Sequence, residues 1–294
     1  MSKIALGTAQ FGLDYGISNT NGKPVKRDAK KIIEYASNNG IDVIDTASKY
    51  GNSEYIIGCS INDKYDWKIV TKTPHFTDNY IDSSHVKQLE EFFSQSLINL
   101  RRKYIYGLLL HSGDDLLKPN GELLFKEMTM LKSSGLVRKI GVSVYSENQI
   151  ERILDKFDID LIQLPINILD QKLLLDGWLN KIKDKNIEIH ARSVFLQGLL
   201  LMKKDLIPPY FSPIVQNIEG FYKLAKELSF NSLELALRFV LGIKEIDKVI
   251  VGVNTIKHLK EIVNISKSGN FQYIECENIA VDNINYTNPS LWKV

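Results

Sequence analysis

The chain has 294 residues, of which 44% are hydrophobic and 24% are charged, and this composition is typical of a globular protein with a large core. The formal net charge is only +2, so charge gives no reason to expect a nucleic acid or an anionic membrane as a partner. Cys59 and Cys276 form no CxxC motif, which argues against a disulfide scaffold and a zinc site. The five histidines lack the i, i+4 spacing of a ligand pair, so we expect no metal site.

No apolar run approaches the ~18 residues that a membrane-spanning helix needs. The first apolar run ends after a few residues, so it lacks the pattern of a signal peptide. We therefore expect a cytoplasmic protein. Residues 45–252 show no linker or change in composition, which predicts a single domain over residues 1–294 with a polar tail from about residue 270 to 294.

Short apolar runs alternate with amphipathic helical patterns along the chain. Strands are expected over residues 4–6, 43–45, 68–72, 107–111, 139–144, 160–165, 188–193 and 248–252. Helices are expected over residues 26–39, 83–100, 123–134, 173–185, 218–228, 232–241 and 255–267, and a capping box at residues 146–149 opens a further helix. Residues 10–25 and 202–216 are expected to be irregular.

Continuous apolar strands indicate a parallel sheet, because such strands are buried on both faces. Eight strands that are each followed by a helix predict an α/β fold of the (β/α)8 TIM-barrel type, with a closed eight-stranded parallel sheet inside a ring of helices. A Rossmann domain is not indicated, because no GxGxxG motif follows the first strand.

Three of the predicted strands end in side chains that can take part in proton transfer. Asp45, Lys72 and His111 close the second, third and fourth strands, and Tyr50 follows in the loop after Asp45. The active site of such a barrel lies at the carboxyl ends of its strands, so we expect these four side chains to share one opening. If Asp45 and Tyr50 are considered alone, a structural role is at least as good an explanation as a catalytic one, with Asp45 capping a turn and Tyr50 packing against its neighbours.

The chemistry of these groups fits the reduction of a carbonyl. A buried Lys72 needs a charged partner, and Asp45 is the expected one. The Lys72 ammonium beside Tyr50 would favour the phenolate and lower the tyrosine pKa below its usual value of about 10. Such a tyrosine is a general acid for reduction and a base for the reverse reaction. His111 could orient the carbonyl and bind its developing oxyanion.

The motifs around these residues resemble those of the aldo-keto reductase family. They cover almost the whole chain in order, as Gly7-Thr-Ala-Gln-Phe-Gly, Asp45-Thr-Ala-Ser-Lys-Tyr-Gly-Asn-Ser-Glu, Val70-Thr-Lys-Thr, Leu108-Leu-Leu-His, Ile140-Gly-Val-Ser, Gln163-Leu-Pro-Ile-Asn, Ser193-Val-Phe-Leu-Gln-Gly-Leu-Leu and Val249-Ile-Val-Gly. The resemblance implies a (β/α)8 barrel that uses NADPH or NADH without a metal. It also implies that the catalytic residues are Asp45, Tyr50, Lys72 and His111.

The resemblance is less regular at the nicotinamide end of the implied cofactor site. Ser143 and Gln163 match the residues that hold the nicotinamide carboxamide. Val144 replaces an asparagine that is frequent in the family, and Arg192 replaces the tyrosine that usually stacks on the nicotinamide ring. A guanidinium can stack as well, so the position keeps its implied role.

At the adenosine end, Asn254 and His258 replace the basic residues that often bind the 2'-phosphate. The resemblance therefore implies NADPH with only a slight preference, and NADH stays possible. The implied cofactor-binding residues are Gly7, Thr8, Ser143, Gln163, Arg192, Ser193, Phe195, Gly198, Gly252, Asn254, His258 and Glu261.

Two further features allow two interpretations each. His75 follows the Lys72 strand and could touch a substrate, although a surface loop is the better expectation. Tyr286 and Trp292 in the tail could form an aromatic lid, since family members use this segment as a substrate wall, or could pack on the outside of the barrel.

The favoured function is the reduction of a small aldehyde or ketone substrate. This substrate could be a sugar or a sugar derivative. A second hypothesis is a regulatory or redox-sensing barrel that binds the cofactor with little turnover. A third is a barrel with nicotinamide-independent chemistry such as isomerisation, because the fold supports many reactions. A monomer and a small homo-oligomer are both compatible with the sequence.

Overall fold

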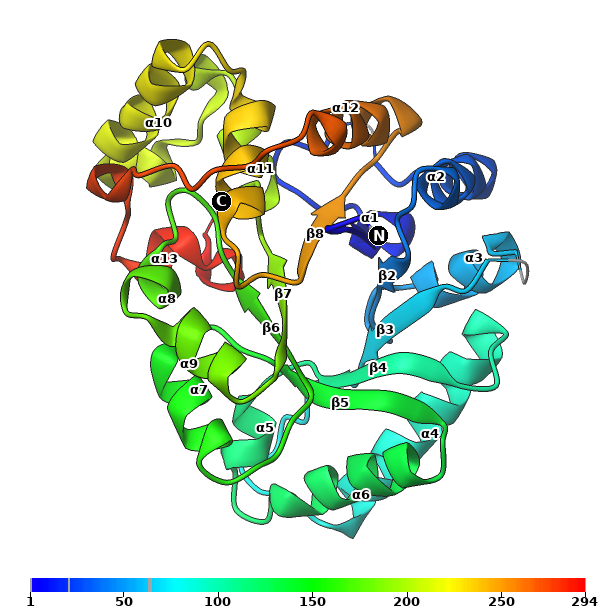
Figure 1. Ribbon diagram of the computed structural model, residues 1–294. Helices are drawn as coiled ribbons and strands as arrows, with labels where there is room; N and C mark the ends of the chain where they lie inside the picture. Colours follow the sequence, from blue (N-terminus) through cyan, green and yellow to red (C-terminus); the bar gives the residue numbers. More distant parts are fainter. Residues whose placement is uncertain (1, 21, 63–64, 294) are drawn as a thin grey trace.

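The eight predicted strands form a closed barrel in the computed structural model, which describes residues 2–20, 22–62 and 65–293 (Figure 1). The strands are β1 (Ile4–Gly7), β2 (Val43–Asp45), β3 (Lys68–Lys72), β4 (Ile105–Leu110), β5 (Val137–Ser143), β6 (Leu161–Pro165), β7 (Glu188–Arg192) and β8 (Lys248–Gly252). Each strand pairs in parallel with its neighbours, and β1 pairs with both β2 and β8, which closes the sheet. The predicted fold class is confirmed.

Successive strand residues point alternately into the barrel and toward the surrounding helices. One hydrophobic cluster takes a residue from each of six strands and fills the inside of the barrel; its members are Ala5, Val43, Val70, Leu109, Leu161 and Ile250. A second, larger cluster joins strand residues such as Ile4 and Leu6 to helix residues such as Ile32 and Leu89. Because the interior is filled with side chains, any ligand site must lie at an end of the barrel.

The helices surround the sheet, as Figure 1 shows. The α-helices are α1 (Ala9–Gly12), α2 (Lys26–Asn38), α3 (Ser53–Ser60), α4 (Ser83–Leu100), α5 (Asp114–Leu117), α6 (Glu122–Ser133), α7 (Glu147–Leu154), α8 (Lys172–Leu175), α9 (Trp178–Asp184), α10 (Val215–Glu227), α11 (Ser232–Gly242), α12 (Ile256–Lys267) and α13 (Ile284–Thr287). The 3-10 helices are η1 (Leu196–Leu201), η2 (Lys204–Leu206), η3 (Pro209–Ile214), η4 (Glu277–Ile279) and η5 (Pro289–Leu291).

Three predicted segments differ from the structure. The expected loop over residues 10–25 begins with the short helix α1. The expected helix over residues 173–185 is divided into α8 and α9, because Gly177 has a left-handed backbone (φ 74°) that no α-helix contains. The expected irregular segment over residues 202–216 contains η2 and η3. The capping box before α7 is confirmed, with the Ser146 hydroxyl accepting from the backbone N–H of Gln149.

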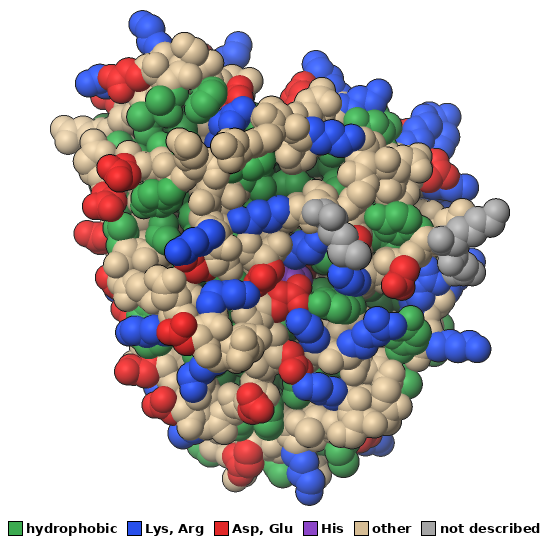
Figure 2. All heavy atoms as spheres, in the orientation of Figure 1, with side chains coloured by type: hydrophobic (Ala, Val, Ile, Leu, Met, Phe, Trp, Pro, Cys, Tyr) green, Lys and Arg blue, Asp and Glu red, His purple; other side chains and the backbone are tan. Residues whose placement is uncertain are grey.

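Charged side chains of both signs are mixed across the face of the molecule shown in Figure 2. This face has no extended area of a single charge, in keeping with the small net charge of +2. Within the described parts of the chain, no helix is both long enough and apolar enough to cross a lipid bilayer.

Candidate active site

A pocket of about 390 Å³ lies at the carboxyl ends of the strands. Its lining comes from the strand ends together with the loops after β1, β2, β5, β7 and β8. Of the sixteen residues that the sequence predicts for the site, the pocket brings together Gly7, Thr8, Asp45, Tyr50, His111, Ser143, Gln163, Arg192, Ser193, Phe195, Gly198, Gly252, Asn254 and His258. Lys72 lies behind Asp45, and Glu261 is exposed on α12 away from this lining.

Asp45 and Lys72 form a buried ion pair where β2 and β3 end. Their side chains are almost inaccessible, with 4% and 1% of the residue surface exposed. Lys72 Nζ donates to both Asp45 carboxylate oxygens at 2.8 Å and to the Thr46 carbonyl, also at 2.8 Å. The Gln163 amide nitrogen donates to the same carboxylate at 2.8 Å. Burial is the largest influence on Lys72 and lowers the pKa of its ammonium, while the Asp45 carboxylate opposes that shift.

Tyr50 is placed over the pocket by a tight loop after β2. Its backbone N–H donates to the Ala47 carbonyl at 3.0 Å, and Gly51 turns the chain with φ 53°. The Lys72 ammonium lies 5.3 Å from the centre of the Tyr50 ring, and the His111 ring meets that ring edge-on at 5.9 Å. These contacts bring the four predicted catalytic side chains together.

The predicted effect of Lys72 on Tyr50 is wrong. Burial is the main cause that raises the pKa of the Tyr50 phenol above its usual range, and the Asp45 carboxylate raises it further. The Lys72 ammonium is engaged by Asp45 and Thr46, so its charge is largely balanced before it can act on the phenol. Tyr50 is therefore a neutral phenol at neutral pH.

His111 lies one residue beyond the end of β4 and is also neutral. Burial, with the nearby charges of Lys72 and Arg192, lowers the pKa of its imidazole to about 3. Its backbone N–H donates to the Thr73 hydroxyl at 3.3 Å, while its Nδ1 is buried without a hydrogen-bond partner among the described residues. His75 is exposed, as expected for a loop, yet its ring stacks on the His111 ring at 4.6 Å.

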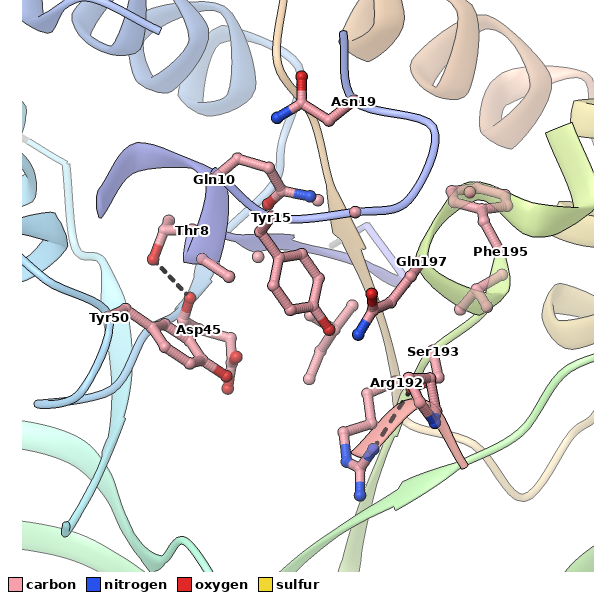
Figure 3. A pocket seen from close by; sticks show the side chains of 18 of the residues that line it. Thr8, Gln10, Tyr15, Asn19, Asp45, Tyr50, Arg192, Ser193, Phe195 and Gln197 are labelled. Carbon is pink, nitrogen blue, oxygen red and sulfur yellow. Dashed lines mark hydrogen bonds between the residues drawn. The ribbon is translucent and has the colours of Figure 1, made fainter. Parts of the chain in front are cut away.

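Arg192 lies at the end of β7 and reaches toward the loop after β5. One terminal nitrogen donates to the Val144 carbonyl at 3.1 Å and the other to the Ser193 hydroxyl at 3.3 Å. The centre of the guanidinium lies 4.1 Å from the centre of the Tyr145 ring. The two departures from the family pattern, Val144 and Arg192, are thus in direct contact. In Figure 3, Arg192 and Ser193 lie across the opening from Tyr50.

The loop after β7 is held against the loop after β1. Ser193, Leu196 and Gln197 have positive φ angles of 60°, 45° and 51°. Gly198 (φ 94°) packs against Ser18 so closely that an added Cβ would lie 1.8 Å from the serine hydroxyl oxygen. The Ile17 N–H donates to the Gln197 carbonyl at 3.1 Å, which joins the two loops over the pocket.

The other end of the pocket is polar and lies beside the start of α12. Thr255 caps this helix by accepting from the His258 N–H, and the Asn254 amide donates to the Gly22 carbonyl at 3.1 Å. Gln10 Oε1 is buried here without a hydrogen-bond partner in the described chain, and an added Cβ on Gly252 would collide with the Gln10 side chain.

These features fit a nicotinamide dinucleotide. The Ser143 hydroxyl and the Gln163 amide offer a donor and an acceptor for a carboxamide at the deep end. The orphaned Gln10 oxygen and the N-terminus of α12 offer polar groups to a ribose and a phosphate at the other end. The described residues contain no group of histidine, cysteine, aspartate or glutamate that could hold a metal ion.

Several lining residues were not predicted from the sequence, among them Tyr15, Tyr145 and Gln197. Burial raises the pKa of Tyr15 to about 12, and Figure 3 shows its hydroxyl directed toward Gln197. The signal for Tyr15 was its position beside Gly16 in the glycine-rich loop after the first strand. Tyr145 follows a strand end by two residues and carried no comparable signal.

The tail reaches the pocket as well. The Trp292 ring meets Phe211 edge-on at 4.9 Å, and Tyr286 packs against Tyr210 at 5.5 Å. Residues 289 and 290 between these aromatics line the pocket. The two aromatic rings thus pack on η3 and are not part of the pocket lining, so the expected aromatic lid is not seen; the segment between them does line the pocket.

Several known proteins are similar to this chain in sequence or in structure. A model of the Aldo/keto reductase family matches residues 3–281. The chain is 26% identical to the oxidoreductase YqkF of Bacillus subtilis, over 91% of this chain and 92% of that protein. It is 25% identical to L-galactose dehydrogenase of Arabidopsis thaliana, over 90% of this chain and 83% of that protein.

Solved structures bear on the fold alone, because their sequences are more distant. The glycerol dehydrogenase AKR11B4 of Gluconobacter oxydans superposes with a TM-score of 0.74 at 23% identity, covering 98% of this chain and 93% of that one. The aldo-keto reductase AKR11C1 of Bacillus halodurans gives a TM-score of 0.72 at 21% identity, covering 94% and 89%.

Proposed function

The chain belongs to the aldo/keto reductase family, and we propose that it is an NAD(P)H-dependent oxidoreductase that reduces an aldehyde or ketone to an alcohol. The observation that carries this proposal is the meeting of Tyr50, His111 and the buried pair of Lys72 with Asp45 at the deep end of one pocket. The rest of the pocket offers the polar groups that a dinucleotide needs.

Tyr50 is the general acid in this proposal. Its burial beside Asp45 raises the phenol pKa, so the hydroxyl carries its proton throughout the neutral range. The proton passes to the carbonyl oxygen while a hydride adds to the carbonyl carbon, and the product is a neutral alcohol. A reduced nicotinamide supplies the hydride when it is bound. The raised pKa suits Tyr50 to the role of acid in reduction, whereas the reverse reaction needs it as a base.

His111 orients the carbonyl. With a pKa lowered to about 3 it remains a neutral imidazole, which donates one hydrogen bond and adds no charge. Lys72 and Asp45 act behind Tyr50 as positioning residues, since their hydrogen bonds fix the ends of β2 and β3 from which the Tyr50 loop departs.

The carbonyl substrate is proposed to be sugar-derived. Support comes from the names of relatives, which include L-galactose dehydrogenase and D-arabinose 1-dehydrogenase of Saccharomyces cerevisiae. NADPH is proposed as the cofactor because it is the usual choice of the family. NADH is the alternative, because among the described residues that line the pocket near α12 there is no lysine or arginine.

Substitution Tyr50→Phe tests the proposal. Loss of the phenolic proton should reduce kcat by about a hundredfold or more, the typical share of a general acid. The dissociation constant of the reduced cofactor should change by less than about twofold, since a phenylalanine keeps the ring. Tyr104→Phe, at an exposed tyrosine remote from the pocket, is the matched control. Activity of Tyr50→Phe within a few-fold of the wild type would show that another group supplies the proton.

A further inference from the structure

Arg192 brings a charge into the pocket that the proposed reaction does not use. Among the described residues that line the pocket, it is the one arginine, and no lysine accompanies it. Its guanidinium is fixed by Val144, Ser193 and the Tyr145 ring, all of which are neutral. A guanidinium has more N–H donors than these two hydrogen bonds occupy, so donors remain for a ligand.

Among the described residues, the charge of Arg192 has no carboxylate at ion-pair distance. No ion pair within 4.0 Å joins it to an acidic side chain in the described parts of the chain. The carboxylate of Asp45 is already bound by Lys72 and Gln163. The charge of Arg192 acts on the Asp170 carboxyl, but no ion pair joins the two, and burial raises the pKa of that carboxyl to about 7, so it is only partly ionised at neutral pH. A partly buried cation without a partner is costly, unless a ligand supplies the opposite charge.

The position of Arg192 indicates which ligand that is. Arg192 lines the same pocket as Tyr50 and His111, and its contacts with Val144 and Tyr145 place the guanidinium beside the loop that follows Ser143. In keeping with this position, its charge lowers the pKa of both Tyr50 and His111. The polar end of the pocket, with Asn254 beside α12, lies at the other end of the lining. The phosphates of a dinucleotide are separated from its nicotinamide by a ribose, so a group that faces Tyr50 across the opening (Figure 3) is poorly placed to bind them.

We propose that the carbonyl substrate carries an anionic group, a carboxylate or a phosphate monoester, and that Arg192 binds this group while the carbonyl faces Tyr50 and His111. This inference rests on the proposed reductase function and adds an anionic group to the proposed substrate. The flat, forked guanidinium matches the geometry of both anions. Its contacts with Val144, Ser193 and Tyr145 hold it in place before the substrate arrives, which reduces the entropy lost on binding.

Paired substrates that differ in charge but hardly in shape test the inference. We would compare para-carboxybenzaldehyde with para-carbamoylbenzaldehyde, and glyceraldehyde phosphate with glyceraldehyde, by the ratio of their kcat/KM values. The wild type should favour the anionic member of at least one pair by about 10- to 100-fold, the range expected for a charge-assisted hydrogen bond. A preference in the benzaldehyde pair would identify the anionic group as a carboxylate, and a preference in the glyceraldehyde pair would identify it as a phosphate. Equal use of both members in both pairs would overturn the inference and leave the reductase function intact.

Three variants assign the preference to the guanidinium. Arg192→Met should bring the ratio close to one, and Arg192→Lys should keep most of it; a loss of activity common to both substrates cancels in the ratio. Arg138→Met is the matched control, because Arg138 is an exposed arginine that stacks on Tyr104 at 4.9 Å outside the pocket. An unchanged ratio in Arg192→Met, with weaker binding of the reduced cofactor, would show that Arg192 serves the cofactor instead.

A binding measurement covers the case in which Arg192→Met has no turnover. Benzoate and benzamide would be titrated against the protein saturated with nicotinamide cofactor. Stronger binding of benzoate by the wild type, lost in Arg192→Met, supports the inference, and equal binding of the two compounds by the wild type contradicts it. Failure of the wild type to bind any nicotinamide cofactor would instead overturn the reductase function itself, and the inference with it.

Discussion

Substitution of Lys72 by methionine removes the charge at the centre of the candidate site and keeps most of the side-chain volume. The lysine is 1% exposed and donates three hydrogen bonds of 2.8 Å, two to the Asp45 carboxylate and one to the Thr46 carbonyl. In Lys72→Met the carboxylate stays buried and, among the described residues, keeps only the hydrogen bond from Gln163. The Thr46 carbonyl loses its side-chain donor at the same time.

The expected loss of stability follows from these contacts. Removing one partner of a buried pair leaves an uncompensated charge and costs about 3–5 kcal/mol of the free energy of unfolding. Domains have about 5–15 kcal/mol in total, so the variant should fold but lose a large share of its stability. The double variant Asp45→Asn with Lys72→Met should cost less than the sum of the two single changes, because it leaves no buried charge.

Urea unfolding followed by circular dichroism measures these differences in the free energy of unfolding. Lys87→Met is the control, since Lys87 forms an exposed 3.8 Å ion pair with Glu91, and such pairs contribute at most about 0.5 kcal/mol. A loss below about 1 kcal/mol in Lys72→Met would refute the reasoning, because it would place the cost of the buried pair in the range of a surface pair.

The pKa of His111 lies at about 3 instead of 6.5, so between these values the unfolded chain binds a proton that the folded protein does not, and stability falls as the pH falls. The wild type should therefore lose free energy of unfolding between about pH 6.5 and pH 5, and His111→Gln should lose up to about 2 kcal/mol less over the same range. Denaturant unfolding at these pH values measures both losses, and equal losses in the two proteins would contradict the prediction. Asn254→Arg should shift the ratio of dissociation constants toward NADPH; no shift would mean that the 2'-phosphate binds elsewhere. Gly198→Ala should weaken cofactor binding, because the added methyl group would collide with Ser18. Gly269→Ala is the control: Gly269 has a similar φ of 90° and open space around it, so this change should cost only the backbone strain. Equal effects of the two changes on cofactor affinity would rule out a role for the Ser18 contact.

The sequence alone was sufficient to predict where the site residues at the strand ends lie. Asp45 and Lys72 end consecutive strands, and parallel pairing brings such ends to one edge whatever the connecting helices do. His111 was expected at the end of a strand and lies one residue beyond it. The eight apolar runs predicted the closed barrel, because continuous apolar strands that alternate with helices indicate a buried parallel sheet.

The parts that depend on loop paths or charge balance could not be predicted in this way. Tyr145 and Gln197 reach the pocket because of contacts between segments distant in sequence, which no local pattern encodes. The pKa of Tyr50 was predicted in the wrong direction because the sequence does not show how fully Asp45 engages Lys72. The predicted cofactor role of Glu261 stays a prediction, since its side chain is exposed on α12 outside the pocket lining.

The most direct test of the proposed reductase is a fluorescence titration of the purified protein with NADPH and, separately, with NADH. The proposal predicts saturable binding of at least one of them with a dissociation constant below about 1 mM, and Tyr50→Phe should bind it equally well. Binding of neither nucleotide by the wild type would contradict the account, because the pocket beside Tyr50 and His111 would then have no source of hydride.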